Sequence, residues 1–246
     1  MIGTHIIRLS KIGSTNQYAL SLLHEEVLPE GTVIVTGNQT EGRGVDNNKW
    51  ESEPGKNLTF SMVIYPNYIP VEEQFYLNKA FSLGIFDLVR KEAGETTRIK
   101  WPNDVYIGDQ KIAGILIQNG IRGNEFSYCV SGIGLNVNQE KFSSMPVDPV
   151  SLKMATGKKY NLNSLLEELS GALNRRLDQL RSGHLDLIDR DYHSALFRLN
   201  EWAGYLYHGK ELKARILGVD SRGHLLLETE EGGRVKCDLK EIKFLV

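Results

Sequence analysis

The stretch TTRIKWPNDVYIGDQKIAGILIQNG, residues 96–120, decides the fold of this 246-residue chain. Its segments 105–107 and 110–118 are rich in apolar and β-branched residues, which is typical of strands. Gly108 and Asp109 lie between these segments and predict a two-residue hairpin turn. The stretch therefore predicts two neighbouring antiparallel strands near the centre of the chain.

Further strands are predicted on both sides of this hairpin. Residues 98–101 have a strand-like composition, and Pro102 ends that segment because proline cannot donate a hydrogen bond to a ladder. Residues 126–131 form another apolar run, and the segments 32–36 and 57–65 predict buried strands earlier in the chain. The middle of the sequence is thus predicted to be a mainly antiparallel sheet.

Helices are predicted before and after these strands. Ser14 and Gln17 have the spacing of a capping box at the start of a first helix. Apolar residues recur at helical spacing in segments 71–92 and 162–180, and a shorter helix is predicted at 185–197. These elements indicate an α+β fold, a central mainly antiparallel mixed sheet flanked by helices.

The C-terminal part of the chain has a different pattern. Short alternating segments are separated by turns at 208–209, 221–223 and 232–233. Strands this short and evenly spaced favour a small β-barrel or sandwich. We therefore expect two domains, residues 1–200 and residues 201–246.

Composition bounds the function. The net charge is −2 and the chain has no dense basic segment, which disfavours nucleic-acid binding. No apolar run approaches the roughly 18 residues needed to cross a membrane, and the N-terminus is too short and polar for a signal peptide. Cys129 and Cys237 belong to no CxxC pair, which disfavours a metal site. A cytoplasmic enzyme or binding protein is the expectation.

The segment EGRGVDNNKW, residues 41–50, has the glycine spacing of a phosphate-binding loop. It lacks the third glycine of a dinucleotide fingerprint and the GK[ST] of a P-loop. Taken alone, a surface turn is the favoured interpretation. A ligand site is the alternative, because Arg43 can bind a carboxylate or phosphate with two hydrogen bonds.

Two other segments carry candidate ligand groups. Lys100, Asp104 and Lys111 would cluster if the 105–118 hairpin folds back, and such a cluster suits a phosphate-bearing ligand. A pair of surface lysines is an equally good interpretation. In SGIGLNVN, Asn136 and Asn138 offer amide groups to a ligand, whereas a tight bend that needs glycine is the alternative.

Six segments in order resemble the biotin–protein ligase family: STNQ, QTEGRG with a following tryptophan, SEPGKNLTFS, KWPND, KIAGILIQ and GIGLNVN. The resemblance covers most of residues 1–200, and residues 201–246 fit the family's small SH3-like domain. It implies a two-step reaction. Biotin and ATP form biotinyl-5′-AMP and pyrophosphate, and a lysine of a biotin carboxyl carrier domain then accepts the biotin.

The resemblance also implies roles for residues. Lys111 and Arg43 match the family's positions at the junction of the biotin carboxylate and the phosphate, and Asp104 is our candidate to orient the acceptor amine. The catalytic residues are then Lys111, Arg43 and Asp104. Biotin would contact Ser14, Thr15, Gln39, Gly42, Arg43, Lys111, Gly114 and Ile115. ATP or the adenylate would contact Arg43, Gly44, Trp50, Lys100, Asn103 and Asn136.

Cofactors and partners follow from the same resemblance. Magnesium is expected with the ATP phosphates, without protein ligands. The partner is a carrier domain of a biotin-dependent carboxylase, and pairing of two copies is left open. Family members often begin with a DNA-binding segment, whereas STNQ begins here at Ser14, so no DNA binding is expected.

One departure and three alternatives remain. Family loops carry a basic or amide residue and then more basic residues after GRG, whereas Val45 and Asp46 follow here. We therefore expect the segment Val45 to Asn48 to hold the adenylate less by charge and more through backbone groups, Trp50 and loop closure. A lipoate–protein ligase, a non-enzymatic biotin-binding regulator and an SH3-like interaction module are the alternatives. Biotin-dependent pyrophosphate release separates an enzyme from the last two, and lipoate in place of biotin separates the two ligases.

Overall fold

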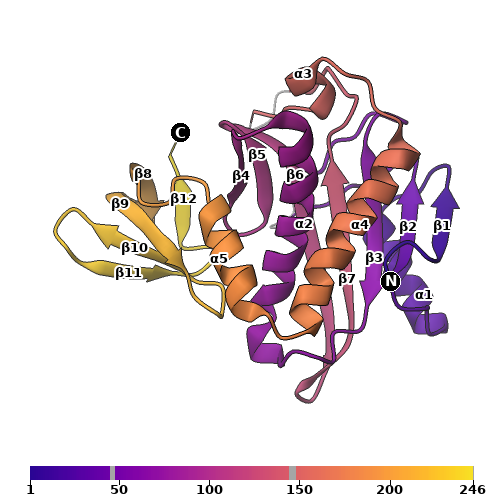
Figure 1. The fold of residues 1–246 in the computed structure, drawn as a ribbon, viewed down its shortest axis with the longest axis horizontal. Helices are drawn as coiled ribbons and strands as arrows, with labels where there is room; N and C mark the ends of the chain where they lie inside the picture. The colour runs from indigo at the N-terminus through magenta and orange to yellow at the C-terminus, as the bar shows by residue number, and fades with distance from the viewer. Residues whose placement is uncertain (45–47, 144–147, 246) are drawn as a thin grey trace.

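The computed structural model describes residues 1–44, 48–143 and 148–245, and its largest element is a seven-stranded sheet. The strand order is β1-β2-β3-β7-β6-β5-β4 (Figure 1). The strands are β1 (Ile6–Leu9), β2 (Thr32–Thr36), β3 (Leu58–Ile64), β4 (Thr97–Lys100), β5 (Asp104–Ile107), β6 (Gln110–Arg122) and β7 (Glu125–Leu135). Only the β1–β2 pair is parallel, so the predicted mainly antiparallel mixed sheet is confirmed.

The hairpin predicted around residue 108 forms as expected. Ile107 pairs with Gln110, and Gly108 has a φ of +58°, a conformation that glycine adopts without steric cost. β6 and β7 are longer than predicted and form a ten-pair ladder from Ala113–Leu135 to Arg122–Glu125. Several residues of the candidate site lie on this pair of strands.

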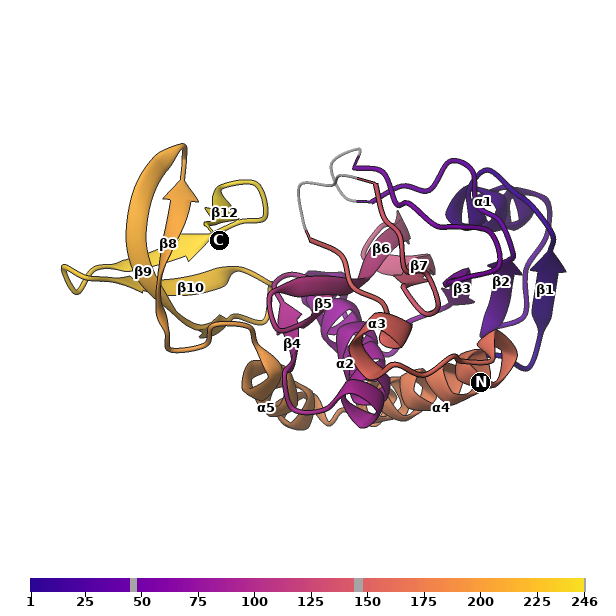
Figure 2. The ribbon, with the colours of Figure 1, turned by 90° about the horizontal axis from the view of Figure 1, so that it is seen from above.

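Helices cover the two faces of the sheet unequally (Figure 2). The helices are α1 (Thr15–Glu25), α2 (Phe75–Ala93), α3 (Leu152–Thr156), α4 (Leu162–Arg181) and α5 (Leu185–Ala195), with a 3₁₀ turn at Val71–Glu73. α2 and α4 pack on one face in the main core, and α1 packs on the other face over a small cluster that includes Val63 and Val130. Part of that second face stays uncovered by helices, and the candidate site lies there.

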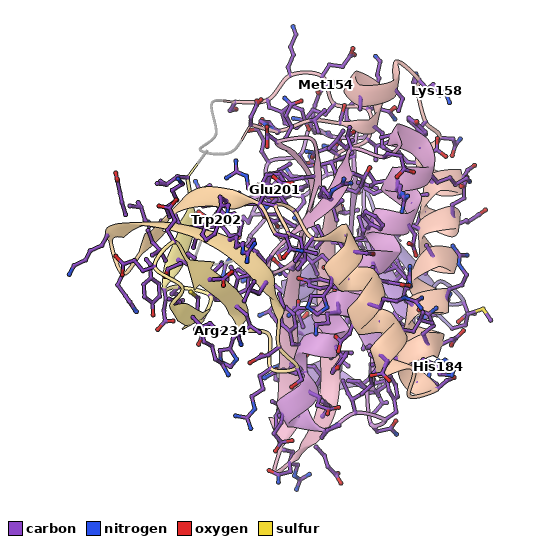
Figure 3. All side chains as sticks on the ribbon, turned by 60° about the vertical axis from the view of Figure 1, so that its left-hand side comes forward. Met154, Lys158, His184, Glu201, Trp202 and Arg234 are labelled. Atoms are coloured by element: carbon purple, nitrogen blue, oxygen red, sulfur yellow. The ribbon has the colours of Figure 1, made fainter. Side chains whose placement is uncertain are left out.

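Local signals explain where the helices begin. The Ser14 side chain caps α1 as predicted, accepting from the Gln17 backbone N–H at 3.5 Å. Asn161 caps α4 in the same way. Lys158 and His184, which are labelled in Figure 3, lie shortly before and shortly after this helix in the chain. Gly84 of α2 permits its close packing, because a Cβ there would lie 2.8 Å from the Leu173 side chain of α4.

The C-terminal part is a five-stranded antiparallel sheet of order β11-β10-β9-β8-β12. Its strands are β8 (Trp202–Tyr207), β9 (Lys210–Val219), β10 (Leu225–Thr229), β11 (Arg234–Cys237) and β12 (Ile242–Phe244). Its strands lie to one side of α5, and Trp202 and Arg234 are labelled on it in Figure 3. The division of the chain at residue 201 remains our proposal.

A buried lysine of α2 connects α5 with the loop between β9 and β10 of the C-terminal sheet. Lys79 of α2 is 0% exposed, and its ammonium lies 2.5 Å from Asp189 of α5. The same ammonium donates to the backbone oxygen of Asp220 at 3.4 Å. Nearby, the Trp101 indole N–H donates to the backbone oxygen of Gly223 at 2.9 Å. The loop between β9 and β10 is therefore hydrogen-bonded to both α2 and the KWPND segment.

Among the described residues, no helix is both long enough and apolar enough to cross a membrane.

Candidate functional site

A cavity of about 1380 Å³ opens on the sheet face that α1 leaves uncovered. It is bounded by the start of α1, the loop that follows β2, and parts of β3, β5, β6 and β7. Every predicted site residue except Lys100 lines it: Ser14, Thr15, Gln39, Gly42, Arg43, Gly44, Trp50, Asn103, Asp104, Lys111, Gly114, Ile115 and Asn136. The segments that the sequence suggested separately therefore meet at one place.

Glycines form the floor of the cavity. Gly114 of β6 pairs with Gly134 of β7, and Gly132 lies two residues earlier in β7. A Cβ on Gly132 would lie 2.2 Å from Oδ1 of Asn16, and a Cβ on Gly134 would lie 2.2 Å from the Trp50 ring. The alternative of a tight bend at these glycines is wrong, because both lie inside a regular strand. Glycine is needed at both positions because the Asn16 and Trp50 side chains lie directly against the strand backbone there.

An ion pair forms the wall beside this floor. Lys111 Nζ lies 2.6 Å from Asp104 Oδ2, and each side chain is 26% exposed. A Cβ on Gly114 would lie 3.3 Å from both Lys111 Nζ and Asp104 Oδ1, so the glycine leaves room for the pair. The Lys111 backbone donates to Asp148 and accepts from Val150, which fixes its position. A partly exposed lysine–aspartate pair is thus presented to the cavity.

Lys100 was expected to cluster with Asp104 and Lys111, but it forms no ion pair with Asp104 among the described residues. Its ammonium lies 4.9 Å from the Tyr106 ring and 5.0 Å from the Phe244 ring, outside the cavity lining. Burial lowers the pKa of Lys100, and the charge of Asp104 opposes that shift. The predicted three-residue cluster is therefore corrected to Asp104 and Lys111, while Lys100 links β4 to the C-terminal sheet.

At the opposite side of the cavity, α1 meets the loop after β2. The Gln39 side-chain oxygen accepts from the Thr15 backbone N–H at 2.9 Å, and it lies 3.2 Å from the Thr15 hydroxyl. Gly42 allows the loop to pass close to both Gln39 and Trp50. A Cβ there would lie 2.4 Å from the Trp50 carbonyl oxygen and 2.9 Å from Gln39 Nε2. This side offers neutral polar groups, in contrast to the charged wall at Lys111.

Arg43 lies on the stem of the glycine loop. Its backbone bridges to Lys49, and Gly44 N–H donates to the Asn48 oxygen at 2.7 Å. With the Gln17 amide turned so that its oxygen faces Arg43, the guanidinium donates to it at 3.1 and 3.2 Å. The prediction that Val45 to Asn48 hold the adenylate through backbone groups concerns mostly residues 45–47, which lie outside the described residues.

Two polar atoms at the cavity are buried without a partner among the described residues. They are Trp50 Nε1, a donor, and Asn136 Oδ1, an acceptor. Asn136 is held by a bond from its Nδ2 to the Val150 oxygen at 3.1 Å, and Asn103 by a bond to the Ile115 oxygen. Because buried polar atoms are normally paired, this donor and acceptor indicate a polar ligand. Asn138, by contrast, bonds the Tyr160 backbone.

The residues Asn16, Thr59, Phe60, Leu116, Gly132 and Gly134 also line the cavity and were not singled out from the sequence. One signal was present: Thr59 and Ser61 are polar residues at alternate positions of the otherwise apolar strand β3. Alternate residues of a strand point to the same face. Their shared face, however, can be assigned to the cavity only once α1 is placed.

Within the described ranges, no group of three or more His, Cys, Asp or Glu side chains is placed to hold a metal ion. The charged side chains that line the cavity are instead Arg43, the Lys111–Asp104 pair, and Glu41, Lys49 and Glu51. Arg43 and Lys111 can bind an anionic ligand, whose phosphates would bring their own cation.

Comparisons with known proteins show which sequences and folds this chain is similar to. Residues 9–136 match the profile described as the Biotin/lipoate A/B protein ligase family. The chain is 31% identical to the Bifunctional ligase/repressor BirA of Bacillus spizizenii, over 94% of this chain and 72% of that protein. It is 27% identical to the Biotin–[acetyl-CoA-carboxylase] ligase of Mycobacterium tuberculosis, over 92% and 83%. The solved structure of biotin protein ligase from Aquifex aeolicus, in complex with biotin and ATP, has the same fold, with a TM-score of 0.81, 24% identity and 98% coverage of both chains.

Proposed function

Because the chain belongs to the biotin/lipoate A/B protein ligase family, we propose that the cavity described above is the place where biotin and ATP react. The activity is that of a biotin–protein ligase that acts through biotinyl-5′-AMP. The observation that carries the assignment of the site is the Lys111–Asp104 pair, 2.6 Å apart on the cavity wall.

In the first step, a biotin carboxylate oxygen attacks the α-phosphorus of ATP. The bond from that phosphorus to the bridging oxygen breaks, and pyrophosphate leaves with the electron pair. The two reactants are both anionic, so a cation must offset their repulsion. Lys111 supplies it by exchanging Asp104 for the reacting oxygens, and Arg43 supplies a second cation from the loop stem. Magnesium enters with the ATP phosphates as part of the substrate.

Biotin lies across the glycine floor in this proposal. Its carboxylate reaches Lys111, and its cyclic urea lies at Ser14, Thr15 and Gln39 on the opposite side of the cavity. Gly114 and Ile115 line the path between the two ends. The neutral polar end and the charged end of the cavity thus match the neutral and charged ends of the ligand.

The adenylate is held by the remaining groups. Trp50 Nε1 and Asn136 Oδ1 are the unpaired donor and acceptor, and a purine ring with its amino group presents both complementary functions. Gly44 and Asn103 also line this part of the cavity.

Gly134 gives a prediction for the nucleotide end. Gly134→Ala places a Cβ 2.2 Å from the Trp50 ring and must displace it. We expect the KM for ATP to rise about tenfold, as for the loss of one contact of 1–2 kcal/mol. Gly171→Ala in α4 is the control, since a Cβ there meets nothing closer than 3.7 Å. Equal KM values for the two variants would contradict the placement of Trp50.

In the second step, a lysine amine of a biotin carboxyl carrier domain attacks the mixed anhydride carbonyl. The C–O bond to phosphate breaks, AMP leaves, and the ammonium must lose a proton. Asp104 is freed when Lys111 turns to the phosphate, and its carboxylate can then orient the amine or accept that proton.

Asp104→Asn tests this role. We expect transfer from preformed biotinyl-5′-AMP to slow by about 10²-fold in single-turnover measurements, the contribution of one general base. Asp109→Asn, in the exposed hairpin turn, is the matched control and should keep the rate of the unaltered chain. An unchanged transfer rate in the Asp104 variant would remove this residue from the second step.

The function itself is tested by incubation with ATP, Mg²⁺, biotin and a carrier domain. We expect biotin-dependent release of pyrophosphate and a mass increase of the carrier by one biotinyl group. Omitting biotin or replacing it with lipoate should prevent both signals. Release that depends on lipoate would favour a lipoate ligase, and biotin binding without any release would favour a regulator.

A further inference from the structure

A buried hydrogen-bonded chain lies behind the neutral end of the cavity, and we propose that its member Ser61 is a positioning residue that selects a ligand N–H. Ser61 is 0% exposed and lines no part of the cavity. Its Oγ lies 2.7 Å from the Thr15 hydroxyl oxygen and 2.6 Å from Asn16 Oδ1. The inference rests on the proposed function, because it concerns the ligand that occupies this end.

The direction of each hydrogen bond follows from the chemistry of the partners. Asn16 Nδ2 donates to the Leu116 backbone oxygen and to Gln118 Oε1, both at 3.0 Å. The Leu116 oxygen can only accept, so the Asn16 amide cannot be turned over, and its Oδ1 faces Ser61. Oδ1 cannot donate. The single hydroxyl proton of Ser61 must therefore point at Asn16.

This leaves one direction for the next bond. Ser61 has no second proton, so the 2.7 Å contact with Thr15 forms only if the Thr15 hydroxyl donates to Ser61. The Thr15 proton is then turned away from Gln39. Gln39 Oε1 is itself fixed as an acceptor by the Thr15 backbone N–H at 2.9 Å. The cavity end thus presents two acceptor oxygens, Thr15 Oγ1 and Gln39 Oε1, only 3.2 Å apart.

Two neighbouring acceptors without a proton between them repel each other and are stabilised by a donor from outside. An N–H group placed between them would donate to both. A cyclic urea carries two such groups, whereas the dithiolane of lipoate carries none. A site built to bond an N–H rejects an analogue that lacks it, because the buried acceptors are then left unpaired. Ser61 acts through Thr15 and touches no ligand.

Ser61→Ala tests this inference. Without the Ser61 oxygen, the Thr15 hydroxyl turns to donate to Gln39 Oε1, and one acceptor is lost. We expect the KM for biotin to rise by about 10- to 100-fold, with kcat within about threefold of its value in the unaltered chain. The KM for ATP should stay within twofold of its value in the unaltered chain, because Ser61 acts only at the biotin end of the cavity.

The controls separate positioning from packing. Ser131 pairs across from Met62 in the neighbouring strand, is equally buried, and its Oγ has no partner among the described residues. Ser131→Ala should leave the KM for biotin unchanged. Ser61→Thr keeps a hydroxyl on the same carbon and should retain much of the biotin affinity, whereas Ser61→Cys, whose sulfur is a weak acceptor for the Thr15 hydroxyl, should retain less.

Three outcomes would overturn the inference. They are a KM for biotin within twofold of the unaltered chain in Ser61→Ala, an equal loss in Ser131→Ala, and a parallel rise in the KM for ATP. The last result would assign Ser61 a packing role. Failure of the proposed function looks different, because the unaltered chain would then release no pyrophosphate with biotin.

Discussion

Replacing Lys111 with alanine is expected to lower the rate of biotinyl-5′-AMP formation by about 10²–10³-fold, the usual cost of removing one preorganised charge-stabilising group. The substitution removes the cation that lies 2.6 Å from Asp104 on the cavity wall. The rate falls because the biotin carboxylate and the α-phosphate must then approach each other without the Lys111 cation to offset their repulsion. Rapid-quench measurement of the adenylate gives the rate directly.

Two other variants serve as controls for Lys111→Ala, and circular dichroism checks that its fold is intact. Lys111→Arg keeps the charge but changes its shape, so it should retain more activity than the alanine variant. Lys158→Ala removes an exposed lysine far from the cavity lining, and its rate should equal that of the unaltered chain. Adenylate formation at near-full rate in Lys111→Ala, with the fold intact by circular dichroism, would refute the central assignment.

Lys79→Ala is expected to lower the free energy of unfolding by about 3 kcal/mol, because it removes a fully buried cation and leaves its partner Asp189, which is 31% exposed, without an opposite charge. Asp189, the partner, also accepts from the Tyr76 hydroxyl at 2.7 Å and keeps that bond. The lysine ammonium additionally lies 4.7 Å from the Tyr76 ring, a contact that is lost. For a chain of this length the melting temperature should fall by about 10 °C.

Lys91→Ala is the matched control. Lys91 lies in the same helix as Lys79 and forms an ion pair with Glu168 of α4, but it is largely exposed. Its melting temperature should change little. Replacing both partners, as Lys79→Met with Asp189→Leu, should recover much of the stability lost in Lys79→Ala, because no unpaired charge remains. Equal melting temperatures for Lys79→Ala and Lys91→Ala would show that burial of this pair contributes nothing.

The sequence predicted the elements whose signals are local. The 105–118 hairpin, the Ser14 cap and the alternating C-terminal strands each depend on neighbouring residues, and each forms. β1 was not predicted, because Ile6–Leu9 becomes a strand only by pairing in parallel with β2, which lies about 25 residues later. Non-local pairing of this kind leaves no pattern within a short window.

The site divides in the same way. Lys111 was singled out as part of the predicted hairpin and Gly114 through the family resemblance, and both lie on the same strand, β6. Ser61 was missed because its partners come from α1, 45 and 46 residues earlier. Lys79 was also missed: within a helix it has the character of an exposed residue, and only Asp189, 110 residues later, explains its burial.

The bond from Trp101 to Gly223 has a consequence for engineering. Trp101 precedes Asp104 in the KWPND segment by three residues, so the C-terminal sheet is hydrogen-bonded directly to the segment that leads into the strand pair of Asp104 and Lys111. Gly223 cannot be exchanged freely, since its φ is +94° and a Cβ would lie 2.3 Å from the Phe75 ring. A chimera that takes its C-terminal sheet from a relative would therefore need a matching β9–β10 loop, and the two parts of this chain are not interchangeable modules.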